Sequence, residues 1–435
     1  MPTHVGSHTG ADRVPPNEKT EMKNNDNYQT ATLRCGLRVI YRFCDSPIIN
    51  CGYQIMAGTR DEQPGQEGLA HFCEHSTLKG TERRTARQVQ ACLDSVGGAL
   101  NAYTNKDLTC YYASVLREEL PRAVDLLSDI VFHSVYPKEE LRKERDVILQ
   151  EIESYNDAPA DLIFDDFENA IYKGTDMGHY ILGTKSQVKM IRQPAVAQWA
   201  HDHYHASRAV FYCLGDIRFE ELIRLLDAAL ADQPDAVPVT FRHDDAPTPY
   251  TTGGQTIRKK YNSYQAHVMV GRPTFIQTDS REPVINLLNS LLCGIGMNAL
   301  LNLALREDQG LVYSVEGCNY YYRNTGNWSV FFSSDHHDID KCLDIIRHQF
   351  DRLMNKPLSP DRLEAAKRQR IGQLRMLEPR GEAFAQEMAT LYLNFGQLLD
   401  DGALCRSIAG VTAEEIRQLA RWLFEPGQLT TYIYE

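Results

Sequence analysis

Residues 68–75 read Gly-Leu-Ala-His-Phe-Cys-Glu-His, a stretch that places two histidines and a glutamate within one short segment. In an α-helix of about 3.6 residues per turn, His71 and His75 lie one turn apart on the same face, and Glu74 points to the same region. Two imidazole nitrogens beside a carboxylate base are what zinc hydrolysis requires. The alternative is a pair of surface histidines on an amphipathic helix, so a third ligand is needed to decide.

The candidate third ligand lies in the stretch 137–159, which reads PKEELRKERDVILQEIESYNDAP. Glu144 and Glu151 fall on the apolar stripe of the helix that this stretch predicts, and the stripe consists of Leu141, Ile148, Ile152 and Tyr155. A carboxylate turned toward a core must be paired, because burying a bare charge is very costly. A metal ion or a buried salt bridge could each pair it, and the nearby His-x-x-Glu-His motif favours the metal.

The chain resembles the M16 family of zinc peptidases, in which an inverted His-x-x-Glu-His motif is followed by a distant glutamate, here Glu151. The segment Ala-Gly-Thr-Arg-Asp-Glu at 57–62 resembles the family's approach to its metal helix, and Lys-Gly-Thr at 79–81 resembles its exit. The family includes insulin-degrading enzyme, the mitochondrial processing peptidase and smaller bacterial relatives. In length the chain is similar to the half-length bacterial members.

This resemblance implies a role for each residue of the two stretches. His71, His75 and Glu151 would bind one zinc ion per chain. Glu74 would act as the general base, and Glu144 would be a supporting carboxylate close to the site.

A further segment, 97–104, predicts a strand that starts at two glycines and returns through a hairpin into 109–115. The two glycines alone indicate no more than a tight turn. A strand beside the metal helix could also bind an extended peptide through its open edge. The family uses this stretch as its substrate edge, and Asn101 and Ala102 match that pattern.

The second half of the chain repeats the plan of the first. The stretch AHVMVGRP at 266–273 resembles GYQIMAGT at 52–59, since each predicts a strand ending at a glycine-containing turn. When Leu363 is aligned with Leu141, Ala366 and Gln373 occupy the positions of Glu144 and Glu151, and the segment 283–294 has neither His nor Glu. The second half is therefore expected to keep the fold without the metal site.

The predicted fold is α+β, with two similar domains that each combine an antiparallel sheet with flanking helices. The proline- and glycine-rich stretch 232–256 is the expected linker between a zinc-binding domain at 28–231 and a metal-free domain at 257–435. Residues 1–27 are polar and without periodicity, and we expect a flexible tail.

Arg306 and Tyr313 resemble an Arg…Tyr element that, in relatives, reaches across a chamber to hold substrate and stabilise the tetrahedral intermediate. Without the resemblance, a helix-terminal arginine and a core tyrosine would be the simpler reading. The pair lies in the half without ligands, so it must complete a site built by the other half. Relatives close two half-length chains into a hollow clamshell, and the presence of both elements in one chain indicates a homodimer.

The composition narrows the partners and the compartment. The net charge of −12 argues against nucleic acid, and no segment reaches the length of about 18 apolar residues that a membrane span needs. We expect neither a secretory signal nor a transit peptide at the start of the chain. Eleven scattered cysteines without a Cys-x-x-Cys pair are typical of a reducing compartment, and we expect the cytoplasm.

Together these features predict a zinc-dependent endopeptidase that hydrolyses unfolded peptides inside a closed chamber. Two alternatives stay open: an inactive structural subunit of the same fold, and the catalytic subunit of an obligate heterodimer. The segment 293–297, Cys-Gly-Ile-Gly-Met, lacks the long glycine-rich loop of the processing peptidase's non-catalytic subunit, so that subunit's role is not assigned.

Overall fold

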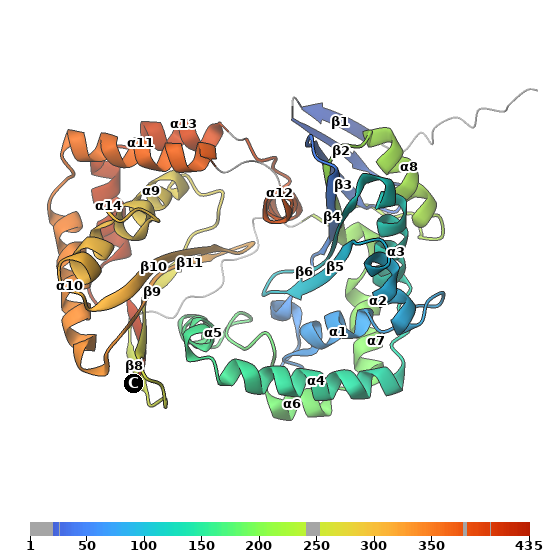
Figure 1. Ribbon diagram of the computed structural model, residues 1–435, viewed down its shortest axis with the longest axis horizontal. Coiled ribbons are helices and arrows are strands. Elements are labelled where there is room, and N and C mark those ends of the chain that lie inside the picture. The colour runs from blue at the N-terminus through green and yellow to red at the C-terminus, as the bar shows by residue number, and fades with distance from the viewer. Residues whose placement is uncertain (1–20, 26, 241–252, 377–380, 401) are drawn as a thin grey trace, which may run out of the picture.

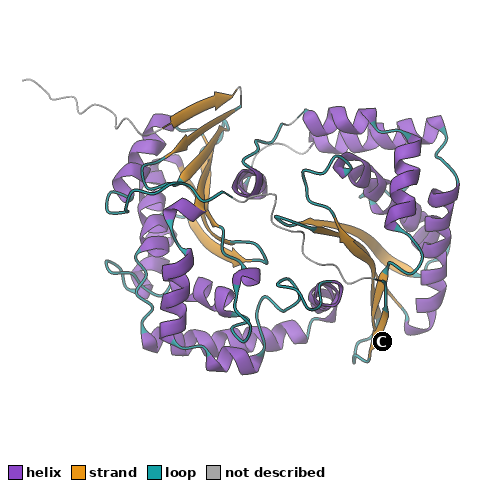
Figure 2. Cartoon of the chain, turned by 180° about the vertical axis from the view of Figure 1, so that it is seen from behind, coloured by secondary structure: helices purple, strands orange, loops and turns teal. Residues whose placement is uncertain are grey.

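The computed structural model describes residues 21–25, 27–240, 253–376, 381–400 and 402–435, and these form two sheets with flanking helices (Figure 1). The expected α+β class, with two similar sheet-and-helix domains, is confirmed. Helices lie on the outer side of each sheet (Figure 2).

The first half carries a seven-stranded sheet of order β1-β2-β3-β7-β4-β6-β5. Its strands are β1 Glu21–Asn25, β2 Tyr28–Thr32, β3 Arg38–Phe43, β4 Ile48–Ile55, β5 Ala99–Thr104, β6 Thr109–Leu116 and β7 Ala209–Gly215. Its helices are α1 Leu69–Thr77, α2 Ala86–Asp94, α3 Leu120–Phe132, α4 Lys138–Asn156, α5 Pro159–Ile171, α6 Lys185–Met190, α7 Gln193–His203 and α8 Phe219–Ala229. Edge strand β5 pairs only with β6 among the described strands.

The second half carries a five-stranded sheet of order β10-β11-β9-β12-β8. Its strands are β8 Thr256–Lys259, β9 Ala266–Thr274, β10 Val312–Tyr321, β11 Gly326–Ser334 and β12 Thr430–Tyr434. Its helices are α9 Glu282–Cys293, α10 Ile339–Asn355, α11 Pro360–Met376, α12 Glu382–Phe395, α13 Ala403–Gly410 and α14 Ala413–Leu423, with a π-helix at Asn302–Glu307.

The two sheets share one topology. The order β8-β12-β9-β11-β10 reproduces β3-β7-β4-β6-β5, so each strand of the second sheet has a counterpart in the first. Helix α11 likewise starts at Pro360 and α4 at Lys138, which is the offset that aligns Leu363 with Leu141. The structure therefore supports the inferred duplication element by element.

Amphipathic helices close the core on the outer face of each sheet. In α8, Phe219, Leu222, Ile223 and Leu226 recur at helical spacing, and all four side chains are buried in the first core. In α10, residues at the same spacing, among them Leu343, Ile346 and Phe350, are buried in the second core. The periodicity of these segments predicts both the helices and the faces that they bury.

Each half donates one helix to the other half's sheet. Residues Met388, Ala389 and Leu393 of α12 pack against the first sheet, in a cluster with Ile40 and Tyr212. In exchange, α5 packs against β9 and β12 of the second sheet. The boundaries at 231 and 257 therefore describe the order of the chain but not which helix covers which sheet.

Two expectations need correction. Each sheet is mixed rather than purely antiparallel, because β3 pairs with β7 and β8 with β12 in parallel. The expected tail 1–27 is also too long, since residues Glu21–Asn25 form β1 and pair with β2. Residues 1–20 and 26, and the central part of the linker at 241–252, lie outside the described residues.

Candidate metal centre

Helix α1 begins directly after Gly68, whose backbone has a φ of 91°, a left-handed conformation that glycine adopts without strain. The carboxylate of Glu62 accepts hydrogen bonds from the amides of Ala70 at 2.7 Å and Gly68 at 3.1 Å, which lie at the start of the helix, where amides lack intrahelical partners. This helix places His71 and His75 one turn apart, with ring centroids 4.6 Å from each other. Both imidazoles thus lie on the same side of the helix.

Glu151 reaches the two histidines from α4. Its carboxylate oxygens lie 3.8 Å from Nε2 of His71 and 3.6 Å from Nε2 of His75. One ligand atom from each of the three residues lies within 4.8 Å of the others, and we call this group the metal-site cluster. The Oε2 atom of Glu151 is buried without a hydrogen-bond partner in the described part of the chain, which fits a carboxylate arranged to bind a metal.

Burial favours the neutral form of His71. Burial, with a smaller contribution from the neighbouring His75, lowers the pKa of His71 to about 3. Imidazole binds metals in its neutral form, so this environment suits a ligand. Two imidazole nitrogens and one carboxylate are a donor set that zinc accepts, and it leaves a fourth position open for water or substrate.

His75 is oriented by a second carboxylate behind it. Its Nδ1 lies 3.2 Å from Oε2 of Glu144, whose Oε1 lies 2.9 Å from Nζ of Lys79. Burial alone would raise the pKa of Glu144, but the contacts with His75 and Lys79 outweigh it and hold the pKa below its usual value. A charged carboxylate on Nδ1 leaves Nε2 free to face the cluster, as in the carboxylate–histidine–metal arrangement of zinc enzymes.

Glu74 occupies the buried side of the same site. Its Oε2 accepts a hydrogen bond from the hydroxyl of Thr104 on β5 at 2.9 Å. Burial raises the pKa of Glu74 to about 7, against the opposing effects of His75 and Thr104. A carboxyl group with a pKa near neutrality can both take up and release a proton, as a general base and acid must.

The proposed substrate residues lie on the strand that also carries Thr104. Asn101 and Ala102 are part of β5, the edge strand of the first sheet, and β5 packs against α1. The backbone on the outer side of β5 therefore runs beside the helix that carries His71 and Glu74.

Arg306 and Tyr313 lie together, but at a different place. The guanidinium carbon of Arg306 is 5.6 Å from the ring centroid of Tyr313, which is 82% exposed at the start of β10. The tip of the β10–β11 hairpin, at the other end of β10, contacts the first half through Arg323 and Asp61. At about 3.3 Å per residue, Tyr313 lies about 26 Å along β10 from the strand's end at Tyr321, which directly precedes that hairpin tip. No hydrogen bond or ion pair within the described residues joins the pair to the metal-site cluster.

Protein-family models match both halves of the chain. The model of the insulinase family, peptidase family M16, matches residues 41–185, and that of the peptidase M16 inactive domain matches residues 191–370. An uncharacterized zinc protease of Streptomyces coelicolor is 30% identical over 402 residues, which are 90% of this chain and 86% of that protein. The chain belongs to peptidase family M16.

Further relatives of this M16 chain cover similar lengths. An uncharacterized zinc protease of Rickettsia bellii is 28% identical over 94% of this chain and 98% of that protein. The β subunit of the mitochondrial processing peptidase of Caenorhabditis elegans is 26% identical over 92% of this chain and 88% of that protein. The chain is thus homologous, over most of its length, to proteins named as zinc proteases.

The M16 fold is also found in solved structures. A protease from Helicobacter pylori superposes with a TM-score of 0.85 at 16% identity, over 94% of this chain and 99% of that one. A peptidase M16 inactive-domain structure from Pseudomonas fluorescens gives a TM-score of 0.83, also at 16% identity, over 94% and 98% of the chains.

The described helices of this M16 chain include none that is long and apolar enough to cross a membrane.

Sequence reasoning missed two residues that hold the site. Thr104 belongs to the predicted strand, but nothing in its spacing indicates that it bonds Glu74. Glu62 belongs to the motif-like segment 57–62, yet its capping of α1 spans a loop and matches no local capping pattern. An acidic residue shortly before a predicted helix is the one signal that could have pointed to this role.

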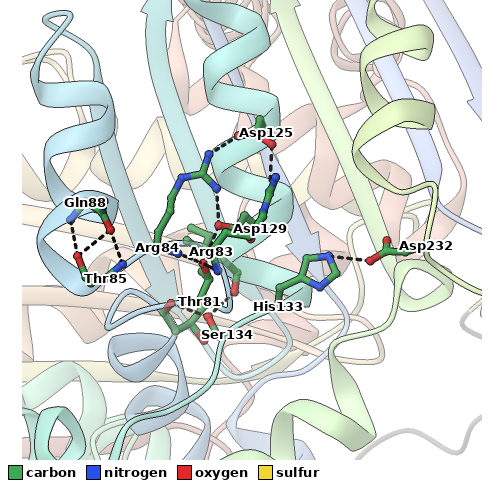
Figure 3. A network of polar contacts seen from close by, with 12 residues as sticks. Thr81, Arg83, Arg84, Thr85, Gln88, Asp125, Asp129, His133, Ser134 and Asp232 are labelled. Carbon is green, nitrogen blue, oxygen red and sulfur yellow. Dashed lines mark hydrogen bonds and ion pairs between the residues drawn. The ribbon is translucent and has the colours of Figure 1, made fainter.

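The loop that follows α1 is fixed by a buried carboxylate on α3 (Figure 3). Asp129 is fully buried and accepts a hydrogen bond from Thr81 at 2.7 Å and from Arg83 at 3.0 Å. Arg84 donates to Asp129 as well, and both arginines also reach Asp125. This network ties the loop after α1 to α3, and the same loop carries Lys79.

Proposed function

We propose that this protein is a zinc-dependent endopeptidase that hydrolyses unfolded peptides or short polypeptides inside a closed chamber. The observation that carries the proposal is the meeting of two helices at one point: His71 and His75 of α1 face Glu151 of α4, with all three ligand atoms within 4.8 Å. Membership of a peptidase family, and homology to proteins named as zinc proteases, support peptide-bond hydrolysis rather than another zinc chemistry.

The residues of the site divide the chemical work. His71, His75 and Glu151 would hold zinc. When bound, zinc would act as a Lewis acid that polarises the scissile carbonyl and makes water a stronger nucleophile at neutral pH. Glu74 takes a proton from the attacking water. Because Thr104 already donates to Oε2, we assign this transfer to Oε1 of Glu74. The same carboxyl group then passes the proton to the leaving amine nitrogen.

The substrate would bind as an extra strand along β5. Strand addition to an exposed edge uses backbone hydrogen bonds and makes few demands on the peptide sequence. Asn101 and Ala102 lie at the middle of that edge, and Thr104 at its end contacts Glu74. A folded protein could not present an extended segment there, which is why we propose unfolded peptides as substrates.

Arg306 and Tyr313 would act on a site in a second copy of the chain, as donors to the developing oxyanion. Their exposure, and their position at the end of β10 remote from the hairpin contact, support this arrangement. We therefore propose a homodimer whose two chains enclose the chamber, with one zinc ion in each. The eleven free cysteines favour the cytoplasm as its compartment.

A heterodimer with a second type of subunit, or an inactive structural subunit, would use the same fold. The neutral His71, the Glu144 contact to His75 and the near-neutral pKa of Glu74 favour an active chain, because a structural subunit needs none of them. Activity of the purified chain alone would exclude the obligate heterodimer.

The test is hydrolysis of an internally quenched fluorescent peptide by the wild type and by Glu74→Gln, with the zinc content of both measured. We expect Glu74→Gln to bind one zinc per chain and to lose activity by more than about 100-fold, since it keeps the shape of the site but cannot accept the proton. Undiminished turnover by this variant would refute the assignment of Glu74.

A further inference from the structure

Four loops meet at the N-terminal end of α1, and we call the place where they meet the loop junction. They are the segment 58–62, the β5–β6 turn 105–108, the loop 177–183 and the hairpin tip 322–325. The segment 58–62 pairs with the turn through backbone hydrogen bonds, from the amide of Thr59 to Asn105 at 3.0 Å and from that of Arg60 to Lys106 at 3.1 Å. The hairpin tip is the only one of the four that comes from the second half.

Glu62 is the innermost carboxylate of the loop junction, and its side chain is fully buried. Besides capping α1, it lies 3.1 Å from Nε2 of His179, which also lies 3.0 Å from the carbonyl oxygen of Thr59. A carbonyl oxygen can only accept, so Nε2 of His179 must carry a hydrogen and donate to both oxygens. The carboxylate thus receives three N–H donors, two from the start of α1 and one from the loop 177–183.

The loop 177–183 and the start of α1 pack so closely that neither Gly68 nor Gly183 has room for a side chain. A Cβ atom on Gly68 would lie 2.7 Å from the carbonyl oxygen of Leu182, and one on Gly183 would lie 2.4 Å from that of Glu67. The buried ammonium group of Lys106 donates to the carbonyl of His179 and so attaches the loop 177–183 to the β5–β6 turn. Glu62 therefore bonds to two segments, the start of α1 and the loop 177–183, whose backbones are in contact with each other.

The second half completes the loop junction. Arg323 donates to Oδ1 of Asp61 at 2.9 Å, while Oδ2 of Asp61 accepts from the amide of Gly58 at 3.0 Å. Arg60, whose side chain is 2% exposed, donates to Asp107 at 2.9 Å and to the side chain of Asn324 at 2.8 Å. The contact between the two halves is thus made by charged side chains that are buried or nearly buried. One of them, Asp61, directly precedes Glu62.

We propose that Glu62 is a positioning residue for the metal site and that Arg323 supports it from the second half, so that the metal-free half helps to set the geometry of His71. The inference rests on the proposed metal site. Its path is short: Arg323 holds Asp61, the next residue Glu62 binds the amide of Ala70, and Ala70 directly precedes His71.

The simpler reading is that the loop junction only stabilises the fold. Removal of Glu62 or Arg323 would then lower the unfolding temperature but leave the coordination of a bound metal unchanged. The visible absorption bands of Co²⁺ report ligand geometry directly, and they do so without turnover, so they separate the two readings.

The experiment uses the full chain loaded with Co²⁺ in place of zinc, for the wild type, Glu62→Gln and Arg323→Ala. Matched controls are Glu140→Gln and Arg117→Ala, which remove an exposed or half-exposed charge from ion pairs with Lys143 and Asp216 outside the loop junction. For each folded protein, the Co²⁺ spectrum and the affinity for Co²⁺ in competition with a chelator are measured. Far-UV circular dichroism shows which variants fold.

We expect both junction variants to change the Co²⁺ bands, and Glu62→Gln to weaken Co²⁺ binding by about 10-fold, at the lower end of what outer-shell residues usually contribute. Arg323→Ala should cause a smaller loss, and the controls none. The proposal is overturned if both variants fold and keep the wild-type spectrum and affinity. If Glu62→Gln fails to fold, Arg323→Ala decides by the same criteria. A wild type that binds no Co²⁺ would instead refute the metal site itself, and the inference with it.

Discussion

His71 and His75 differ in what surrounds their second ring nitrogen. Nδ1 of His75 contacts Glu144, which is also paired with Lys79, whereas Nδ1 of His71 is buried without a partner in the described part of the chain. His71 is therefore oriented by packing and by the start of α1, and His75 by a specific carboxylate. The two proposed ligands should respond to different substitutions.

Glu144→Gln should weaken zinc binding while the protein stays folded. The amide keeps the shape of the side chain but removes the charge that favours the orientation of His75, and such outer-shell changes cost about 10- to 100-fold in metal affinity. Chelator competition with the purified variant measures this loss. Glu139→Gln, an exposed carboxylate at the start of the same helix, is the control, and an equal loss in the control would contradict the role of Glu144.

The roles proposed for His71, Glu74 and His75 could be argued from sequence, because helical spacing brings the three together. The apolar stripe carries both Glu144 and Glu151, and only the resemblance to the M16 family implies Glu151 as the ligand. The partners of these residues could not be argued from sequence. Thr104 reaches Glu74 and Lys79 reaches Glu144 through contacts between elements distant in sequence, and spacing along the chain says nothing about such contacts.

At the scale of elements, both ends of α1 are tied to buried carboxylates. Glu62 binds the amides at its start, and Asp129 binds the loop that follows its end (Figure 3). A helix of only nine residues has little stability of its own, so its position depends on these attachments.

Asp129→Asn should destabilise the protein by about 2 kcal/mol at neutral pH, because the buried carboxylate accepts charged hydrogen bonds that an amide cannot all replace. Burial alone would raise the pKa of Asp129, but the bonds from Thr81, Arg84 and Arg83 outweigh it and lower the pKa. Its contribution is therefore present above the unfolded-state pKa of about 3.9 and lost as the pH falls through the lower folded-state value.

Urea unfolding of the wild type and Asp129→Asn at a series of pH values checks this sign. The difference in unfolding free energy should stay constant between about pH 5 and 8 and shrink below about pH 4. A difference that grows on acidification would contradict the assignment. Asp125→Asn, which alters a half-exposed carboxylate bound to the same arginines, should have a smaller effect at every pH.

Most strands and helices could be predicted, since periodicity and turn residues mark them, but the exchange of α5 and α12 between the halves could not. An amphipathic helix shows which face it buries and not which sheet it covers. In the structure, Asp166 of α5 accepts hydrogen bonds from Tyr432 and Tyr434 of the second sheet. It also forms an ion pair with Lys259. These long-range contacts, like the β1 strand, lie outside what local patterns indicate.

At the scale of the whole molecule, the chain carries two sets of proposed functional residues that do not meet within it. The metal-site cluster lies in the first half, and Arg306 and Tyr313 lie exposed at the end of β10. A symmetric dimer would let each chain's pair serve the other chain's cluster.

Co-expression of Glu74→Gln and Tyr313→Phe chains tests this arrangement. Each variant alone should be nearly inactive. In a mixed dimer, the chain with intact Glu74 would meet the intact Tyr313 of its partner, so a random mixture should recover about a quarter of wild-type activity if sites are shared across a two-fold axis. No recovery in dimers shown to be mixed would place Tyr313 in the site of its own chain, whereas full activity of Tyr313→Phe alone would place it outside the chemistry.

The most direct test of the central claim is peptide hydrolysis by the purified wild-type chain before chelation, after complete removal of metal, and after return of one equivalent of zinc. We predict activity that is lost with the metal and restored by one zinc per chain, since the three proposed ligands, His71, His75 and Glu151, lie together at one point. Hydrolysis that persists in the metal-free protein, or a zinc-loaded chain that cleaves no peptide, would contradict the account.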